Sequence, residues 1–198
     1  FALLAMGVSR LKGIDPAPPR SFQVTQKALV VGGGIAGMTA ALAIADHGYP
    51  VELVEVTGEL GGNLRRLHRT LDGPSPKEVL ERTVARVEKH GMIRIHRKAR
   101  VIHSQGQSGR FYTTIEKDDG SGATLEHGVA ILASGGHEAK TESYGYGLSD
   151  TVVTQHELEE GLQSGVLDPA QLSTVAMIQC VDSREEPRNY CSRICCAT

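Results

Sequence analysis

At 198 residues, the chain is long enough to bury one ordinary hydrophobic core. Apolar residues make up 40% of it and charged residues 22%, which is typical of a soluble globular protein and excludes a disordered or membrane-embedded chain. The formal net charge of −2 gives no general attraction to nucleic acid, and no apolar run approaches the ~18 residues of a membrane helix, so we expect neither a nucleic-acid partner nor a membrane span.

The first 24 residues are predicted to be a connector. Residues 1–14 suit a short helix, and the sequence DPAPP at 15–19 cannot continue one and is typical of a linker. The chain opens with Phe rather than Met, so we expect it to be part of something longer. We expect a nucleotide-binding domain over 25–150 and a C-terminal segment over 151–198.

The next stretch has the pattern of a nucleotide-binding β–α–β unit. Ala28–Val31 is a short apolar run that suits a buried strand, and Val51–Val54 suits a second one. Between them, Gly32, Gly34 and Gly37 form G-x-G-x-x-G at the start of a predicted helix over Ile35–His47. Such glycines permit a tight turn, close approach of a pyrophosphate and close helix–strand packing, while the helix N-terminus attracts the phosphates.

An acidic residue and a second glycine turn complete this unit. Glu55 closes the second strand, where a carboxylate can accept hydrogen bonds from the ribose hydroxyls of an adenosine. Gly61 and Gly62 follow it. A glycine-rich turn in some other α/β domain is the competing interpretation, but the flanking strand, helix and acid all favour dinucleotide binding.

Further along, the sequence predicts two more helical stretches. Leu64, Leu67 and Leu71 within 63–71 are spaced for one helical face, and Ser75–Glu78 is a capping box that opens a helix to about His90. The region 61–100 carries 11 Lys and Arg against 4 Asp and Glu. This excess indicates a solvated helix face and exposed strand, or a basic flank beside a negative cofactor or partner.

The second half of the chain is predicted to be mainly strands. Residues 92–103 alternate apolar and charged with a break near Arg97–Lys98, and Phe111–Glu116 with Ala123–His127 indicate a β-ribbon. A strand is expected at Val129–Gly135, a capped helix from Thr154 to about Leu162, and a last apolar strand over 174–180.

All four cysteines, Cys180, Cys191, Cys195 and Cys196, lie in the last 19 residues. This distribution is unlike a disulfide framework, so a cytoplasmic setting is the default expectation. The thiols suit an iron–sulfur cluster; buried structural cysteines, a zinc site and a redox disulfide relay are the alternatives. No histidine has metal or base spacing, so we assign no catalytic acid, base or nucleophile.

Two of these motifs resemble the two-dinucleotide-binding-domain flavoproteins. VELVEVTGELGG at 51–62 continues the signature of that family, and VAILASG at 129–135 resembles its apolar strand that runs into Ala-Thr-Gly. The resemblance implies an α/β, Rossmann-like FAD-binding domain with a small β-ribbon insertion. It implies FAD contacts from the following residues, with Val101 near the adenine: Gly32, Gly34, Ile35, Ala36, Gly37, Glu55, Gly61, Gly62, Asn63, Leu64, Val101, Ala133, Ser134 and Gly135.

A narrower resemblance covers most of 28–198. The sequence IQCVDSREEPRNYCSRICCAT, together with HGVAILASG and VVTQHELEE, is similar to the heterodisulfide reductase A-subunit family, with Asp182 where that family has a glycine. The resemblance implies a 4Fe-4S cluster on Cys180, Cys191, Cys195 and Cys196, and passage of electrons between FAD and iron–sulfur clusters. The implied partners are other subunits of a redox complex and ferredoxin-like or hydrogenase-type electron carriers.

What the sequence lacks narrows the choice of function. No Cys-x4-Cys dithiol follows Gly61–Gly62, which argues against a disulfide reductase of the glutathione-reductase type, and no second G-x-G-x-x-G follows. Two alternatives stay open: an NAD(P)H-dependent FAD oxidoreductase, and a non-catalytic nucleotide-binding module used for assembly. In the resembling family, later segments complete the flavin pocket, so we expect this stretch alone to bind FAD weakly and to be inactive.

Overall fold

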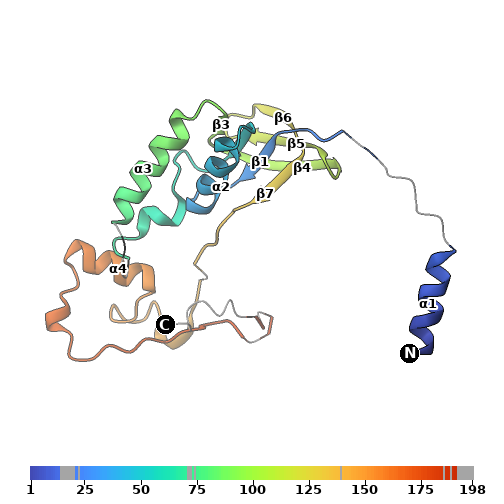
Figure 1. Cartoon of the computed structure of the whole chain (residues 1–198). Helices are drawn as coiled ribbons and strands as arrows, with labels where there is room; N and C mark the ends of the chain where they lie inside the picture. Colours follow the sequence, from blue (N-terminus) through green and yellow to red (C-terminus); the bar gives the residue numbers. More distant parts are fainter. Residues whose placement is uncertain are drawn as a thin grey trace.

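The computed structural model describes residues 1–13, 21, 23–70, 73, 75–138, 140–184, 186–187 and 189–190. It contains a four-stranded sheet, a three-stranded sheet and helices, of which α1 is drawn apart from the two sheets (Figure 1). In chain order the elements are α1 (Ala2–Lys12), β1 (Ala28–Val31), α2 (Ile35–Asp46), β2 (Val51–Val54), the 3-10 helix η1 (Gly62–Arg66), α3 (Pro76–Lys89), β3 (Ile93–His96), β4 (Ala99–Gln107), β5 (Arg110–Lys117), β6 (Gly122–His127), β7 (Val129–Leu132), the 3-10 helix η2 (Ser143–Gly145), α4 (Gln155–Ser164) and the 3-10 helix η3 (Pro169–Gln171).

The four-stranded sheet is parallel and has the strand order β3-β2-β1-β7. Ala28 of β1 is level with Val51 of β2 on one side and with Val129 of β7 on the other. This is the order of a Rossmann-like half-domain, in which the chain first builds outward on one side of β1 and then crosses to the other. The carboxyl ends of β1 and β7 therefore flank the topological switch point where such folds bind ligands.

The two faces of this sheet pack against different layers. Ala28 and Val30 of β1 point to one face, where they meet Met38 and Ala41 of α2 and Val87 of α3. This is the period-2 alternation of a strand, and it sends the intervening side chains the other way.

On the opposite face, Leu29 and Val54 pack against Ala99, Ile115 and Leu125 of the three-stranded sheet. A strand that is buried on both faces of a sheet needs apolar side chains on both sides, because each side packs against a different layer. The predicted α/β, Rossmann-like class with a β-ribbon insertion is therefore confirmed.

The insertion is larger than the sequence indicated. It is an antiparallel sheet of order β4-β5-β6, with a register irregularity between Val101 and His103. The break predicted near Arg97–Lys98 separates β3 from β4, and Lys98 takes a positive φ of 52° there. Residues from Ala99 onward thus leave the parallel sheet and start the ribbon.

Three local predictions are wrong. Only Gly62–Arg66 of the expected 63–71 helix is helical, as a 3-10 turn, and Leu71 lies outside the described residues. Ser75 makes no side-chain capping bond although α3 begins directly after it. Residues 174–179 form no strand, because no neighbouring strand pairs with them in the described part of the chain.

Other predictions hold. The Thr154 capping box is complete: its hydroxyl accepts from the Glu157 N–H, and the Glu157 carboxylate accepts from the Thr154 N–H at 2.7 Å. Helix α1 forms as expected, while the DPAPP linker at 15–19 lies outside the described residues. Among the helices that the structure describes, none has the length and apolar character needed to cross a membrane.

Candidate functional site

The first glycine turn lies at the carboxyl end of β1, directly before α2. Gly32 has a φ of 108°, and a Cβ on it would lie 2.2 Å from the Ala133 carbonyl oxygen. A Cβ on Gly37 would lie 1.8 Å from the Gly32 carbonyl oxygen. Both positions require glycine because the turn, the helix and the end of β7 approach one another too closely for a side chain.

Gly34 is different, because its described surroundings hold no protein atom that a side chain would strike. Its φ is −72°, and a Cβ added there has no neighbour within 4 Å among the described residues. Gly34 is also the N-cap of α2, and no side chain from the described residues caps that end of the helix. Packing within the protein therefore gives no reason for glycine at this position, whereas an anion approaching the helix N-terminus does.

Glu55 is held rigidly beside the turn. Its side chain is buried, and Oε2 accepts a hydrogen bond from the Gly33 N–H at 2.6 Å. The Thr57 N–H at 2.7 Å and the Thr57 hydroxyl at 2.8 Å donate to Oε1. These bonds use three of the roughly four acceptor positions of a carboxylate, so one position stays available for a ribose hydroxyl.

The second glycine turn docks onto the first. The Gly61 N–H donates to the Gly33 carbonyl at 2.8 Å, and Gly34 and Gly61 form an isolated parallel bridge. Gly61 and Gly62 both have positive φ, 122° and 50°, which lets the chain reverse tightly into η1. The Leu64 N–H then donates to the Gly61 carbonyl at 3.1 Å, which anchors this short helix beside the glycine turn.

The end of β7 supplies the third side of the site. The Ala133 N–H donates to the Val31 carbonyl at 2.8 Å, so the chain stays beside β1 one residue past the end of β7. Ser134, Gly135 and Gly136 follow and are at least partly exposed. The Asn63 amide donates to the Gly136 carbonyl at 3.0 Å, which connects η1 to this segment.

The structure thus brings together most of the sequence-predicted FAD residues at one sheet edge. Val101 lies on β4, two residues beyond Ala99, whose N–H donates to the Glu55 carbonyl at 3.0 Å. Val101 is 37% exposed, on the Glu55 side of the site. This position is compatible with its predicted place near an adenine.

The predicted cluster residues are only partly visible. Cys180 is a free, half-buried thiol with a φ of 60°, and Cys191, Cys195 and Cys196 lie outside the described residues. Asp182, at the position where a glycine was expected, has a φ of 51° and accepts a hydrogen bond from the Ser143 hydroxyl at 2.8 Å. Within the described ranges, no three His, Cys, Asp or Glu side chains are grouped to hold a metal.

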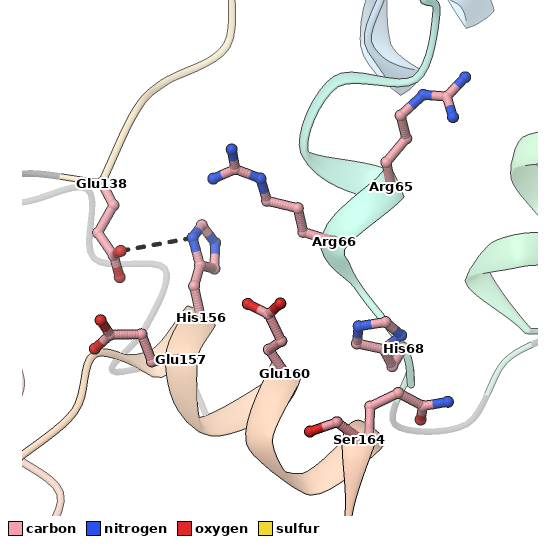
Figure 2. Close-up of a pocket in the computed structure, with 9 residues that line it drawn as sticks. Arg65, Arg66, His68, Glu138, His156, Glu157, Glu160 and Ser164 are labelled. Carbon is pink, nitrogen blue, oxygen red and sulfur yellow. Dashed lines mark ion pairs between the residues drawn. The ribbon is translucent and has the colours of Figure 1, made fainter. Parts of the chain in front are cut away.

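A polar pocket lies between η1 and α4 (Figure 2). Its volume of about 660 Å³ is within the range typical of small-molecule sites. Its wall is made of charged and polar side chains from three segments: Arg65, Arg66, His68, Glu138, His156, Glu157, Glu160, Gln163 and Ser164. The Thr154 backbone N–H and the Tyr146 hydroxyl donate to Glu157 and lower the pKa of its carboxyl group, so Glu157 is an anion at neutral pH.

Comparison with known proteins identifies the family. The sequence pattern of the pyridine nucleotide-disulphide oxidoreductases matches residues 26–175, which include both glycine turns, Glu55 and the β7 segment. The chain belongs to this family.

Curated relatives narrow the resemblance. The chain is 28% identical to an A-type iron–sulfur subunit of CoB–CoM heterodisulfide reductase from Methanopyrus kandleri, over 98% of this chain and 43% of that protein. It is 34% identical, over 58% of this chain and 16% of the relative, to a protein of Archaeoglobus profundus that is named for its likeness to the heterodisulfide reductase A subunit. The predicted similarity to the A subunit of heterodisulfide reductase is thereby confirmed.

The match covers only part of the relatives. This chain spans less than half the length of the Methanopyrus protein. The alignment runs over 289 positions although this chain has 198 residues, so the relative carries stretches within the matched region that have no counterpart here. Among solved structures, L-proline dehydrogenase from P. horikoshii resembles the fold with a TM-score of 0.52 and 21% identity, over 65% of this chain and 26% of that one.

Sequence reasoning missed two parts of the site. Thr57 holds Glu55 in place through two hydrogen bonds. In the sequence, only its position two residues after Glu55 could have indicated this role. The pocket between η1 and α4 gave no signal, because its residues are about 90 positions apart and meet only through tertiary contacts such as the Glu159 carboxylate accepting from the His68 N–H at 2.7 Å.

Proposed function

We propose that this chain binds FAD across the carboxyl ends of β2, β1 and β7 and that it is the FAD-dependent electron-transfer part of a heterodisulfide-reductase-like oxidoreductase complex. The observation that carries the proposal is the convergence of the two glycine turns and the end of β7 around Gly34, where a side chain would meet open space among the described residues. Membership of the oxidoreductase family and similarity to the A subunit of heterodisulfide reductase support it.

In this proposal different residues contact different parts of FAD. Glu55 accepts from the ribose of the adenosine, with Val101 near the adenine. Gly32, Gly34, Ile35, Ala36 and Gly37 form the pyrophosphate-binding turn at the N-terminus of α2, in which the buried Gly37 keeps the helix close to the turn. The flavin end is contacted by the remaining predicted residues, which lie in the η1 and β7 loops: Gly61, Gly62, Asn63, Leu64, Ala133, Ser134 and Gly135.

FAD, when bound, supplies the one- and two-electron redox chemistry, and the chain supplies position and electrostatic environment. No Cys-x4-Cys pair follows the second glycine turn to exchange electrons with a flavin as a dithiol. We therefore assign the second redox centre to a 4Fe-4S cluster on Cys180, Cys191, Cys195 and Cys196. The partners we propose are other subunits of a redox complex and ferredoxin-like or hydrogenase-type carriers, in the cytoplasm.

The test is a spectrum and a metal analysis of the anaerobically purified chain, before and after addition of FAD. We expect quenching of FAD fluorescence on binding, and about four irons per chain with a broad visible band, as a cubane on four thiolates requires. Bound zinc in place of iron would move the cysteines to a structural role. Absence of FAD binding by the folded chain would refute the proposal, and reduction of bound FAD by NADH would favour the NAD(P)H-dependent alternative.

A further inference from the structure

The pocket between η1 and α4 lies in the direction in which a bound FAD would extend. The sheet order places β1 between β2 and β7. An adenosine beside Glu55 at the end of β2 and a pyrophosphate at the end of β1 therefore direct the other end of the cofactor toward the β7 side. Both loops that leave the proposed FAD site on that side enter the pocket wall, one at Arg65 and Arg66 and the other at Glu138.

The pocket is also at a suitable distance. Arg66 lies four residues beyond Gly62 in a 3-10 helix, which rises ~2.0 Å per residue, so it lies about 8 Å along the axis from the glycine turn. That length is comparable to the ribityl chain that separates the pyrophosphate of FAD from its ring. The amide of Asn63 bonded to the Gly136 carbonyl fixes the spacing of the two loops.

Three groups in the pocket wall form no hydrogen bond with the described residues, whereas their neighbours do. Arg65 pairs with Glu59 at 3.1 Å and donates to the Leu60 carbonyl, and Glu157 is bonded to Tyr146. By contrast, neither Arg66 nor Glu160 forms an ion pair within the described part of the chain. Figure 2 shows Arg66 directed toward the space above His156, and Glu160 next to His156 on the same helix.

The third group is a buried imidazole nitrogen. Nδ1 of His156 is shielded from solvent and has no hydrogen-bond partner in the described residues; the Glu138 carboxylate, 3.7 Å away, is within ion-pair distance but beyond hydrogen-bond distance. A buried polar atom without a partner is costly, and such atoms in folded proteins are normally satisfied by a ligand or a water. Within the described ranges, the pocket therefore presents a free cation, a free anion and an unsatisfied imidazole to one space.

These groups match the pyrimidine edge of a flavin. That edge carries acceptors at N1, the C2 carbonyl and the C4 carbonyl, and a donor at N3–H. Two-electron reduction with uptake of one proton leaves a negative charge spread over N1 and the C2 carbonyl, and protein charges near this locus tune the cofactor. A guanidinium stabilises that charge, and a nearby carboxylate opposes it.

We infer that this pocket receives the pyrimidine edge of the flavin, that Arg66 favours reduced FAD, and that Glu160 favours oxidised FAD. The inference rests on the proposed FAD binding and adds to it a control of redox preference by two charged side chains that sequence analysis did not single out. His156 completes the set by hydrogen bonding to the ring edge.

The test compares dissociation constants for oxidised and dithionite-reduced FAD, measured anaerobically by fluorescence and absorbance at mildly alkaline pH. Arg66→Gln should weaken binding of reduced FAD relative to oxidised FAD by about tenfold, the low end for hydrogen bonds to charged groups. For a two-electron couple this ratio equals a potential about 30 mV more negative. Glu160→Gln should change the ratio in the opposite direction. Arg69→Gln removes an exposed charge that does not line the pocket and should leave the ratio unchanged.

The possible outcomes distinguish failure of this inference from failure of the proposed FAD binding. If the unaltered chain binds neither form of FAD, the proposed function fails. If it binds FAD but Arg66→Gln and Glu160→Gln leave the ratio of the two dissociation constants as it was, or shift it in the same direction, the inference is overturned and FAD binding stands. A melting temperature for each variant distinguishes loss of binding from loss of the fold.

Discussion

Replacement of Gly34 or of Gly37 by alanine separates a glycine that makes room for a ligand from one that the fold itself requires. Both belong to the G-x-G-x-x-G motif, so the sequence alone gives them equal weight. In the structure a methyl group on Gly34 meets nothing within 4 Å among the described residues, whereas a methyl group on Gly37 lies 1.8 Å from the Gly32 carbonyl oxygen. Gly91, in the loop between α3 and β3, also has open space and serves as the control.

The magnitudes differ because the causes differ. Gly34→Ala loses part of the N-cap preference, which costs up to about 1 kcal/mol, but removes freedom from the unfolded chain, which returns about 0.4–1 kcal/mol. Its free energy of unfolding should therefore stay within about 1 kcal/mol of the original. Gly37→Ala pushes the buried start of α2 away from β1 and should cost about 3 kcal/mol, the upper end of ordinary overpacking.

The effect on FAD affinity should be the reverse for Gly34. A methyl group in the space above the helix N-terminus removes at least one charge-assisted hydrogen bond to the pyrophosphate, worth about 1.5–3 kcal/mol, so binding should weaken at least tenfold. Urea denaturation and titration of FAD fluorescence measure the two quantities. Gly91→Ala should change neither by more than about 1 kcal/mol. A Gly34→Ala variant that binds FAD normally, or that unfolds as readily as Gly37→Ala, would refute the reasoning.

Two further predictions concern stability. His127 is buried: its Nδ1–H donates to the Val129 carbonyl at 3.1 Å, and Nε2 of the neutral ring accepts from the Thr113 hydroxyl at 2.8 Å. Burial lowers the pKa of His127 despite the opposing effect of the Val129 carbonyl. The folded state therefore binds fewer protons than the unfolded one below pH 6.5, so the free energy of unfolding should fall as the pH drops below that value. His127→Gln should remove this pH dependence of the free energy of unfolding, measured by urea denaturation at several pH values. An unchanged pH dependence in that variant would contradict the assignment. Thr154→Ala removes a complete capping box and should cost about 1 kcal/mol of α4 stability, measured as faster hydrogen exchange of the α4 amides. Ser75→Ala should leave the stability of α3 nearly unchanged, because Ser75 makes no capping bond to the described residues. Equal effects of these two alanines would show that the difference between the caps is not real.

The first β–α–β unit could be predicted from the sequence because its signals are local. Gly32, Gly34 and Gly37 specify a turn and a close helix within six residues, and apolar runs on either side specify buried strands. The break at Arg97–Lys98 was equally visible, since the alternation of apolar and charged residues changes there. In each case the conformation of a residue is decided by residues adjacent to it in the sequence.

The failures share the opposite property. The apolar run at 174–179 suits a strand, but a strand needs a partner, and none lies beside it in the described residues. Ser75 has the sequence of a cap, but its side chain makes no capping hydrogen bond to the described residues of α3. Leu67 has helical spacing, yet it ends η1 in an extended conformation as the chain turns toward α4.

By itself, the sequence determined the glycine turns, the acid after β2, the fold class and the resemblance to a flavoprotein family. Only the tertiary structure distinguished Gly34 from Gly37, fixed Glu55 through Thr57, and placed Arg66 and Glu160 about one pocket. The physical reason is that turns and strands follow from interactions between near neighbours in the chain. A binding site depends on which donors and acceptors are left unpaired once distant segments have packed, and that set of groups exists only in the folded molecule.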